Sequence, residues 1–120
     1  MQYGHARIAS IFARAPHDLV ERARRGDALD RLVEPAEIAL ARRLSQFPGI
    51  VRAVATARAP HRLARYAQDV ASDFSQFYAA CKVLGDDADL STARLGLALA
   101  AQTILASTLA LLGVSAPDSM

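Results

Sequence analysis

The sequence predicts an all-α fold, a bundle of five or six helices with an apolar C-terminal helix at its centre. Hydrophobic residues make up 52% of the 120 residues, and many of them are Ala and Leu, which have high helix propensities. Gly and Pro divide the chain into segments. Within these segments apolar residues recur at steps of three and four, which is the period of one helix face.

The first helix is expected from about residue 2 to residue 15, where Pro16 stops it. Its apolar face consists of Gly4, Ile8, Ile11, Phe12 and Ala15. A different face carries Tyr3, Arg7, Ser10 and Arg14. A short second helix is expected over residues 18–25 and ends at Gly26, because glycine readily adopts the left-handed conformation that stops a helix. Residues 27–33 show no clear pattern.

Pro35 is expected to begin the next helix, since the first helical position needs no N–H donor. The apolar surface of this helix comes from Ile38, Leu40, Ala41, Leu44 and Phe47. Pro48 and Gly49 are expected to break it, and a second short helix should follow from residue 50 to about residue 58.

Pro60 begins what the spacing predicts to be the longest helix, which ends at Gly85. One continuous apolar seam runs along it, formed by Leu63, Ala67, Val70, Phe74, Phe77, Cys81 and Leu84. Residues 85–90 form an acidic loop, after which either Asp89 or Ser91 caps the last helix.

The last helix is expected to run to Leu112 and to stop at Gly113. It is apolar on nearly every side, which favours a central position in the bundle. The run from residue 95 to residue 112 is interrupted by polar residues and barely long enough to cross a bilayer, so we expect a buried helix and no membrane contact. Residues 1–120 are expected to form one domain.

Charge is distributed unevenly along the chain. Residues 1–84 hold thirteen of the fourteen basic residues and eight of the twelve acids, whereas residues 85–120 hold one basic residue and four acids. This distribution permits a polyanionic partner. The single cysteine, Cys81, excludes an internal disulfide, and the beginning of the chain does not resemble a signal peptide. We therefore expect a cytoplasmic protein.

Sequence motifs typical of catalytic sites are absent from the chain. There is no glycine-rich phosphate loop, nucleophile elbow or pair of histidines with metal-binding spacing. The acidic loop lacks the spacing of a calcium site and is interpreted as a solvated connection. Aromatic residues beside arginines suit stacking on unpaired RNA bases, and the candidates are Tyr3 with Arg7, and Tyr78. Phe74 and Phe77 are assigned to the core.

Three segments resemble the DALR-type anticodon-binding domain of class I arginyl-tRNA synthetases. The first is Tyr-Gly-His-Ala-Arg-Ile-Ala-Ser-Ile, from Tyr3 to Ile11. The second is Pro-His-Arg-Leu from Pro60, followed by Phe-Ser-Gln-Phe-Tyr-Ala-Ala-Cys-Lys-Val from Phe74. The third is the stretch from Leu109 to Met120, Leu-Ala-Leu-Leu-Gly-Val-Ser-Ala-Pro-Asp-Ser-Met. They keep the order of the family and span nearly the whole chain.

This resemblance implies that the chain binds the anticodon arm of arginine tRNA, whose central anticodon base is C because every arginine codon has G in the middle. The family's anticodon surface corresponds to Tyr3, Tyr78 and Met120, with Tyr3 and Tyr78 stacking on or hydrogen-bonding bases. Met120 would offer an apolar contact or its carboxylate, and Arg7 and Arg14 would contact phosphates. Departures from the family pattern are Gly4 for Ala, Lys82 for Arg and Thr108 for Gly.

The nucleotide-binding motifs of a class I synthetase are missing from the sequence. The chain is therefore expected to be a domain excised from a synthetase, with Met1 as an added start. It should need no cofactor itself, whereas ATP and magnesium would act in the absent catalytic domain, which is also its expected partner. Two alternatives remain: a stand-alone module that binds tRNA or a protein, and a purely structural helical bundle.

Overall fold

The computed structural model describes residues 10–57 and 60–113. Residues 10–14 are helical and lead into α2 (His17–Arg24) and the short 3₁₀ helix η1 (Leu29–Arg31). Next come α3 (Pro35–Ser45), α4 (Phe47–Ala57), α5 (Pro60–Ala80) and α6 (Ala88–Leu111). The described residues are thus helical throughout apart from turns and short connections, which confirms the predicted all-α class.

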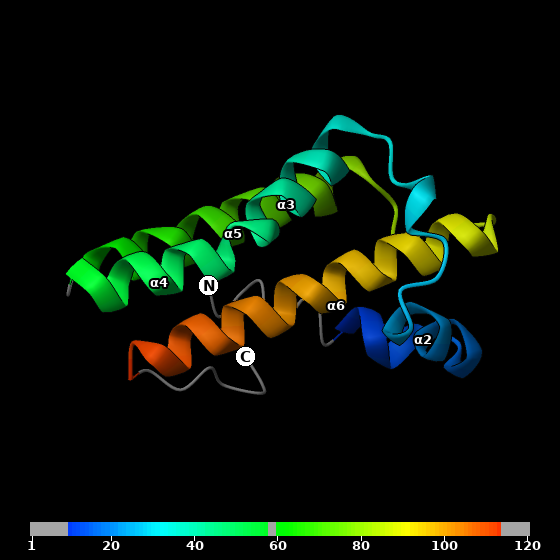
Figure 1. Ribbon diagram of the computed structural model, residues 1–120. Coiled ribbons are helices and arrows are strands. Elements are labelled where there is room, and N and C mark those ends of the chain that lie inside the picture. Colours follow the sequence, from blue (N-terminus) through cyan, green and yellow to red (C-terminus); the bar gives the residue numbers. More distant parts are fainter. Residues whose placement is uncertain (1–9, 58–59, 114–120) are drawn as a thin grey trace.

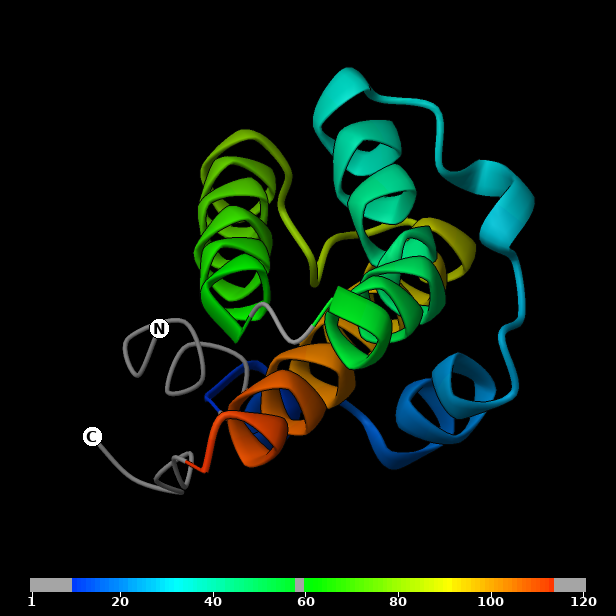
Figure 2. The ribbon, with the colours of Figure 1, turned by 60° about the vertical axis from the view of Figure 1, so that its left-hand side comes forward.

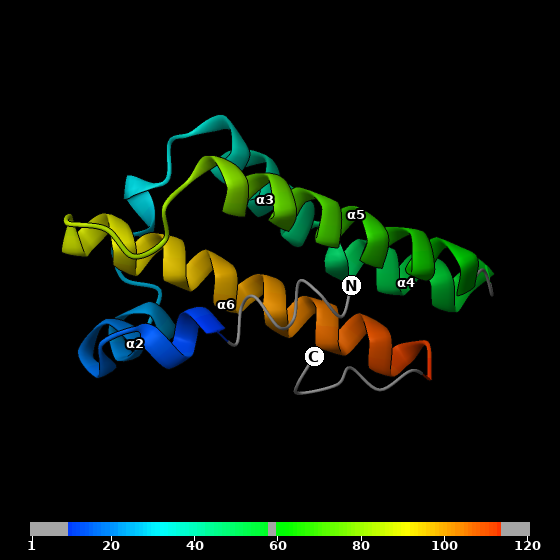
Figure 3. The same cartoon turned by 180° about the vertical axis from the view of Figure 1, so that it is seen from behind.

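The apolar last helix lies at the centre of the bundle, as predicted. In Figures 1 and 3, α3, α4 and α5 form a layer on one side of α6, and α2 lies on the other side. The helix packs against α2, η1, α3 and α5. By length and apolar composition α6 is the one described helix that could cross a membrane, but these contacts make it the core helix of the bundle.

The core joins all the main helices through large apolar side chains. The seam predicted on α5 is confirmed, because Leu63, Ala67, Val70, Phe74, Phe77 and Cys81 are buried and Leu84 packs against the core. Ile11 is buried, so the helical segment at residues 10–14 also contributes to this core. On α3 the prediction was only partly right, since Leu40 and Leu44 are buried whereas Ile38 is 42% exposed and Ala41 is exposed.

Two helix boundaries differ from the sequence prediction. The helix α4 begins at Phe47, ahead of the predicted break at Pro48 and Gly49. The reason is that Pro48 occupies the first turn, where a missing N–H breaks no intrahelical bond, and the Ile50 amide already donates to the Gln46 carbonyl at 3.0 Å. The helix α5 ends at Ala80 rather than Gly85, so α6, with 24 residues against 21, is the longest described helix.

The connection between α5 and α6 explains why α5 ends early. Its last described helical bond runs from the Cys81 amide to the Phe77 carbonyl. The Lys82 carbonyl then accepts a hydrogen bond from the Arg94 guanidinium at 3.0 Å, and the Gly85 amide donates to Ser91 Oγ at 2.9 Å. The side chains of Arg94 and Ser91 on α6 thus bind the backbone of residues 82–85. In this position the backbone does not continue the helix α5.

The cap of α6 is Asp87, and the predicted caps Asp89 and Ser91 were wrong. One Asp87 carboxylate oxygen accepts from the amides of Asp89 and Leu90. Backbone hydrogen bonding from Leu90 and the Arg31 guanidinium hold the pKa of Asp87 below its usual range. Because folding lowers this pKa, its stabilising contribution is present above the ordinary carboxyl pKa and is lost as the pH falls through the lower folded value.

The ends of α2 and α6 agree with the prediction. Gly26 has φ of 77° after α2, and Gly113 has φ of 78° after α6. The segment without a clear sequence pattern contains η1, which is preceded by Ala28 in the left-handed conformation with φ of 63°. A 3₁₀ helix of three residues is too short to show the apolar period of a helix, which is why the pattern of residues 27–33 did not indicate one.

Candidate nucleic-acid interface

Tyr78 lies near the C-terminal end of α5, at the edge of the core. Its ring centroid is 6.1 Å from that of Phe74, which is itself fully buried and 6.0 Å from Phe77. Tyr78 is only partly buried. The prediction that Phe74 and Phe77 are core residues while Tyr78 lies at the boundary is therefore confirmed.

The opposite flank of α5 is occupied by α3. Arg43 of α3 pairs with Asp73 at 2.8 Å and with Asp69 at 3.6 Å, and the Tyr66 hydroxyl donates to the Arg43 carbonyl at 2.6 Å. Desolvation raises the pKa of Tyr66 to about 12, so this hydroxyl remains a donor at neutral pH. Asp69 and Tyr78 are separated by about two and a half helical turns and point to opposite sides. The flank that carries Tyr78 is thus not the one that contacts α3.

Arg14 is exposed on the segment that begins the described structure. Its Nε donates to the Ser10 carbonyl at 3.4 Å, and it forms no ion pair with a described residue. Ile11, three residues earlier, points into the core. Of the other predicted contacts, Tyr3, Arg7 and Met120 lie outside the described residues, so the structure describes Tyr78 and Arg14 alone of the predicted site.

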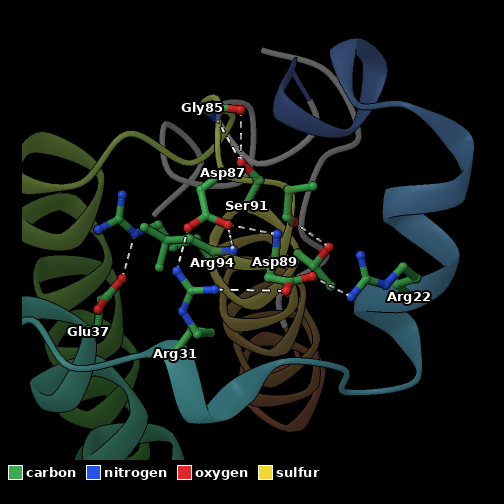
Figure 4. Close-up of polar contacts among 11 residues, drawn as sticks. Arg22, Arg31, Glu37, Gly85, Asp87, Asp89, Ser91 and Arg94 are labelled. Carbon is green, nitrogen blue, oxygen red and sulfur yellow. Dashed lines mark hydrogen bonds and ion pairs between the residues drawn. The ribbon is translucent and has the colours of Figure 1, made fainter.

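The acidic loop is solvated, as interpreted from the sequence, because residues 85–89 are exposed. Its carboxylates nevertheless form ion pairs that the sequence did not predict. Asp89 pairs with Arg22 of α2 at 2.9 Å, and Asp87 pairs with Arg31 of η1. Figure 4 shows these carboxylates between the two arginines at the beginning of α6. Arg22 and Arg31 are therefore engaged within the chain, and the loop's negative charge is largely compensated at this end of the bundle.

Ion pairing reduces the number of basic side chains that can meet a polyanion. Arg43 and Arg94 pair with carboxylates as well. Among the residues that the structure describes, the basic side chains with no ion pair and an exposed position are Arg14, Arg24, Arg42, Arg62, Arg65 and Lys82. Arg62 and Arg65 lie on α5, and Lys82 follows Tyr78 by four residues, so three of the six belong to the region around α5.

One buried ion pair between α3 and α6 was missed in the sequence prediction. Glu37 is completely buried, and its Oε2 accepts from Arg94 Nε at 2.6 Å. Its Oε1 accepts from the amides of Val33 and Glu34. Arg94 also holds the Lys82 carbonyl, so this pair joins the beginning of α3, α6 and the segment after α5. The sequence does contain a signal for the bonds that Glu37 makes to the backbone. Glu34 precedes α3 and Glu37 follows Glu34 by three residues, which is the spacing of a capping box.

The described part of the chain holds no group of three or more His, Cys, Asp or Glu side chains placed to bind a metal. The geometry defines a helical domain that has the aromatic ring of Tyr78 at the edge of its core and exposed arginines on its surface. The chain therefore belongs to the class of all-α helical-bundle domains.

Comparison with known proteins identifies the family. Residues 1–120 match the DALR anticodon binding domain, and the chain belongs to this family. It is 48% identical over its full length to the arginine–tRNA ligase of Bordetella petrii and 43% identical to that of Salinibacter ruber. It covers 21% of the length of each relative.

The fold of a solved relative agrees with this assignment. The Thermus thermophilus arginyl-tRNA synthetase superposes with a TM-score of 0.80 at 34% sequence identity, over 99% of this chain and 20% of that protein. The chain thus spans about a fifth of the length of the ligases it matches, and the resemblance found in its motifs is confirmed.

Proposed function

We propose that this chain binds the anticodon arm of arginine tRNA for an arginyl-tRNA synthetase. The observation that supports this most strongly is the match to the anticodon binding domain over residues 1–120, together with relatives that are arginine–tRNA ligases. Attachment of arginine to tRNA, with ATP and magnesium, would take place in a catalytic domain outside this chain. The domain itself would need no cofactor and would work in the cytoplasm.

The proposed interface lies on the flank of α5 that carries Tyr78. An anticodon loop presents unstacked bases, and an aromatic ring at a surface can stack on such a base. The Tyr78 ring is held on one side by Phe74, which would fix its orientation before RNA arrives. Arg14 would contact a phosphate. By resemblance to the family, Tyr3, Arg7 and Met120 would complete the surface, and its central target would be C.

Replacing Tyr78 with Ala is expected to weaken binding of arginine tRNA by about 5- to 150-fold, since stacking on one base contributes about 1–3 kcal/mol. Tyr78→Phe keeps the ring and should retain most of the affinity if stacking dominates. The measurement is a titration of the chain with arginine tRNA at low salt, with helicity checked by circular dichroism.

Gln76→Ala provides the matched control, because Gln76 is exposed on the same helix but points to a different side from Tyr78. Its affinity for arginine tRNA should equal that of the unmodified chain. A folded Tyr78→Ala variant that binds arginine tRNA with unchanged affinity would remove Tyr78 from the interface.

A further inference from the structure

A groove separate from the flank of Tyr78 lies between α2, α3 and α6. It encloses about 1060 Å³. Its walls come from the end of α2, η1 and one side of α3, and its floor is formed by α6 from Gly96 to Ile104. In Figure 2 this is the side of the molecule where α2 and α3 lie apart with η1 between them.

The groove is unusually apolar for a surface exposed to water. Leu29 and Ile38 in its walls are 48% and 42% exposed. The floor helix has no charged residue after Arg94, and only 39% of its most apolar stretch is buried. Adjacent exposed apolar side chains of this kind mark surfaces that another protein covers.

Basic residues stand along the rim of this groove. Arg24 and Arg42 are exposed and form no ion pair with a described residue, and Arg25 pairs with Asp27. Among the described lining residues the sole carboxylate is Glu37, which Arg94 neutralises. The surface thus combines an apolar floor with a positive rim.

These features favour a protein helix over RNA as the occupant. The described lining contains no aromatic side chain on which a base could stack, and an apolar floor offers no donors to phosphates. An amphipathic helix would place its apolar stripe on the floor, and carboxylates beside that stripe would meet Arg24 and Arg42.

We propose that this groove receives an acidic amphipathic helix from the part of the synthetase that lies outside this chain. The proposal rests on the proposed function, because it assumes that the chain works within a synthetase. The relatives leave ample chain for such a helix, since this domain accounts for only 21% of their length. The docked helix would fix the anticodon-binding domain relative to the remainder of the enzyme.

Thiol labelling of the full-length synthetase tests this proposal without tRNA. Ala100→Cys places a thiol on the floor of the groove, at an exposed position. Ala39→Cys is the matched reference, because Ala39 is exposed on α3 but does not line the groove. Burial raises the pKa of the native Cys81 thiol, so this thiol should react slowly with maleimide.

Labelling at residue 100 should be about tenfold or more slower in the full-length synthetase than in the isolated chain, because a docked helix must open before the thiol reacts. Labelling at residue 39 should not change.

Adding Arg24→Glu and Arg42→Glu should restore fast labelling at residue 100, since the reversed rim repels an acidic helix. Arg62→Glu with Arg65→Glu changes the net charge equally and should leave the protection in place. Mass spectrometry of the peptides follows each site.

Equal labelling of residue 100 in both proteins, or equal protection at residues 39 and 100, would overturn the proposal. Protection that appears only after arginine tRNA is added would assign the groove to RNA instead. Protection that survives reversal of Arg24 and Arg42 would show that the docked segment is not acidic. The results obtained without tRNA do not depend on tRNA affinity, so failure of the proposed function would be seen separately in the Tyr78 titration.

Discussion

Replacing Arg94 with Ala is expected to lower the free energy of unfolding by about 3–5 kcal/mol, the usual cost of removing one partner of a buried ion pair. Glu37 is fully buried, and the Arg94 side chain is 14% exposed. Without the guanidinium, the Glu37 carboxylate would keep only its two backbone donors, Val33 and Glu34. The hydrogen bond to the Lys82 carbonyl would be lost as well. Urea unfolding followed by circular dichroism measures the difference.

Arg43→Ala is the appropriate comparison, because Arg43 also joins two helices through carboxylates but is 33% exposed. Its loss should lower the free energy of unfolding by only about 0–1 kcal/mol, as for solvent-exposed pairs. Equal losses for Arg43→Ala and Arg94→Ala would mean that the buried pair has no special part in joining α3, α6 and the segment after α5.

Replacing Phe74 with Ala is expected to lower the free energy of unfolding by about 3–5 kcal/mol, because truncation of a buried ring loses apolar burial and leaves a cavity. Phe74 is completely buried and contacts the rings of both Phe77 and Tyr78. A loss of this size is a large fraction of the stability of a small domain. Thermal and urea unfolding of the variant provide the measurement.

Ser75→Ala, at the exposed position next to Phe74, should change the free energy of unfolding by no more than about 0.5 kcal/mol. If Phe74→Ala changed the free energy of unfolding as little as Ser75→Ala, the seam of α5 would not form the core as described. Such a result would also remove the support that Phe74 gives to the Tyr78 ring.

Most of the fold followed from local patterns in the sequence. The seam of α5 was predictable because its apolar residues recur at helical spacing, and the ends of α2 and α6 followed from Gly26 and Gly113. The end of α5 was not predictable in this way. It depends on hydrogen bonds from Arg94 to Lys82 and from Gly85 to Ser91, between residues whose proximity only the folded chain creates.

The same limit applies to the candidate interface. The pattern of α5 distinguished a boundary ring at Tyr78 from the core rings at Phe74 and Phe77. It could not show that Arg22 and Arg31 are engaged by Asp89 and Asp87, because these pairs join segments far apart in the sequence. Counting charges therefore overestimated the basic surface. The cap at Asp87 was missed for a local reason, because Asp87, Asp89 and Ser91 are all of residue types that cap helices.

Competition between tRNAs that differ only in the central anticodon base tests the central claim most directly. The labelled reference is arginine tRNA bound to the unmodified chain, and the competitors carry C, U, A or G at that position. The tRNA with C should compete best, and each other base should weaken competition by about 5- to 150-fold, the discrimination expected from base-specific hydrogen bonds worth about 1–3 kcal/mol. Equal competition by all four tRNAs would contradict recognition of the arginine anticodon by this domain.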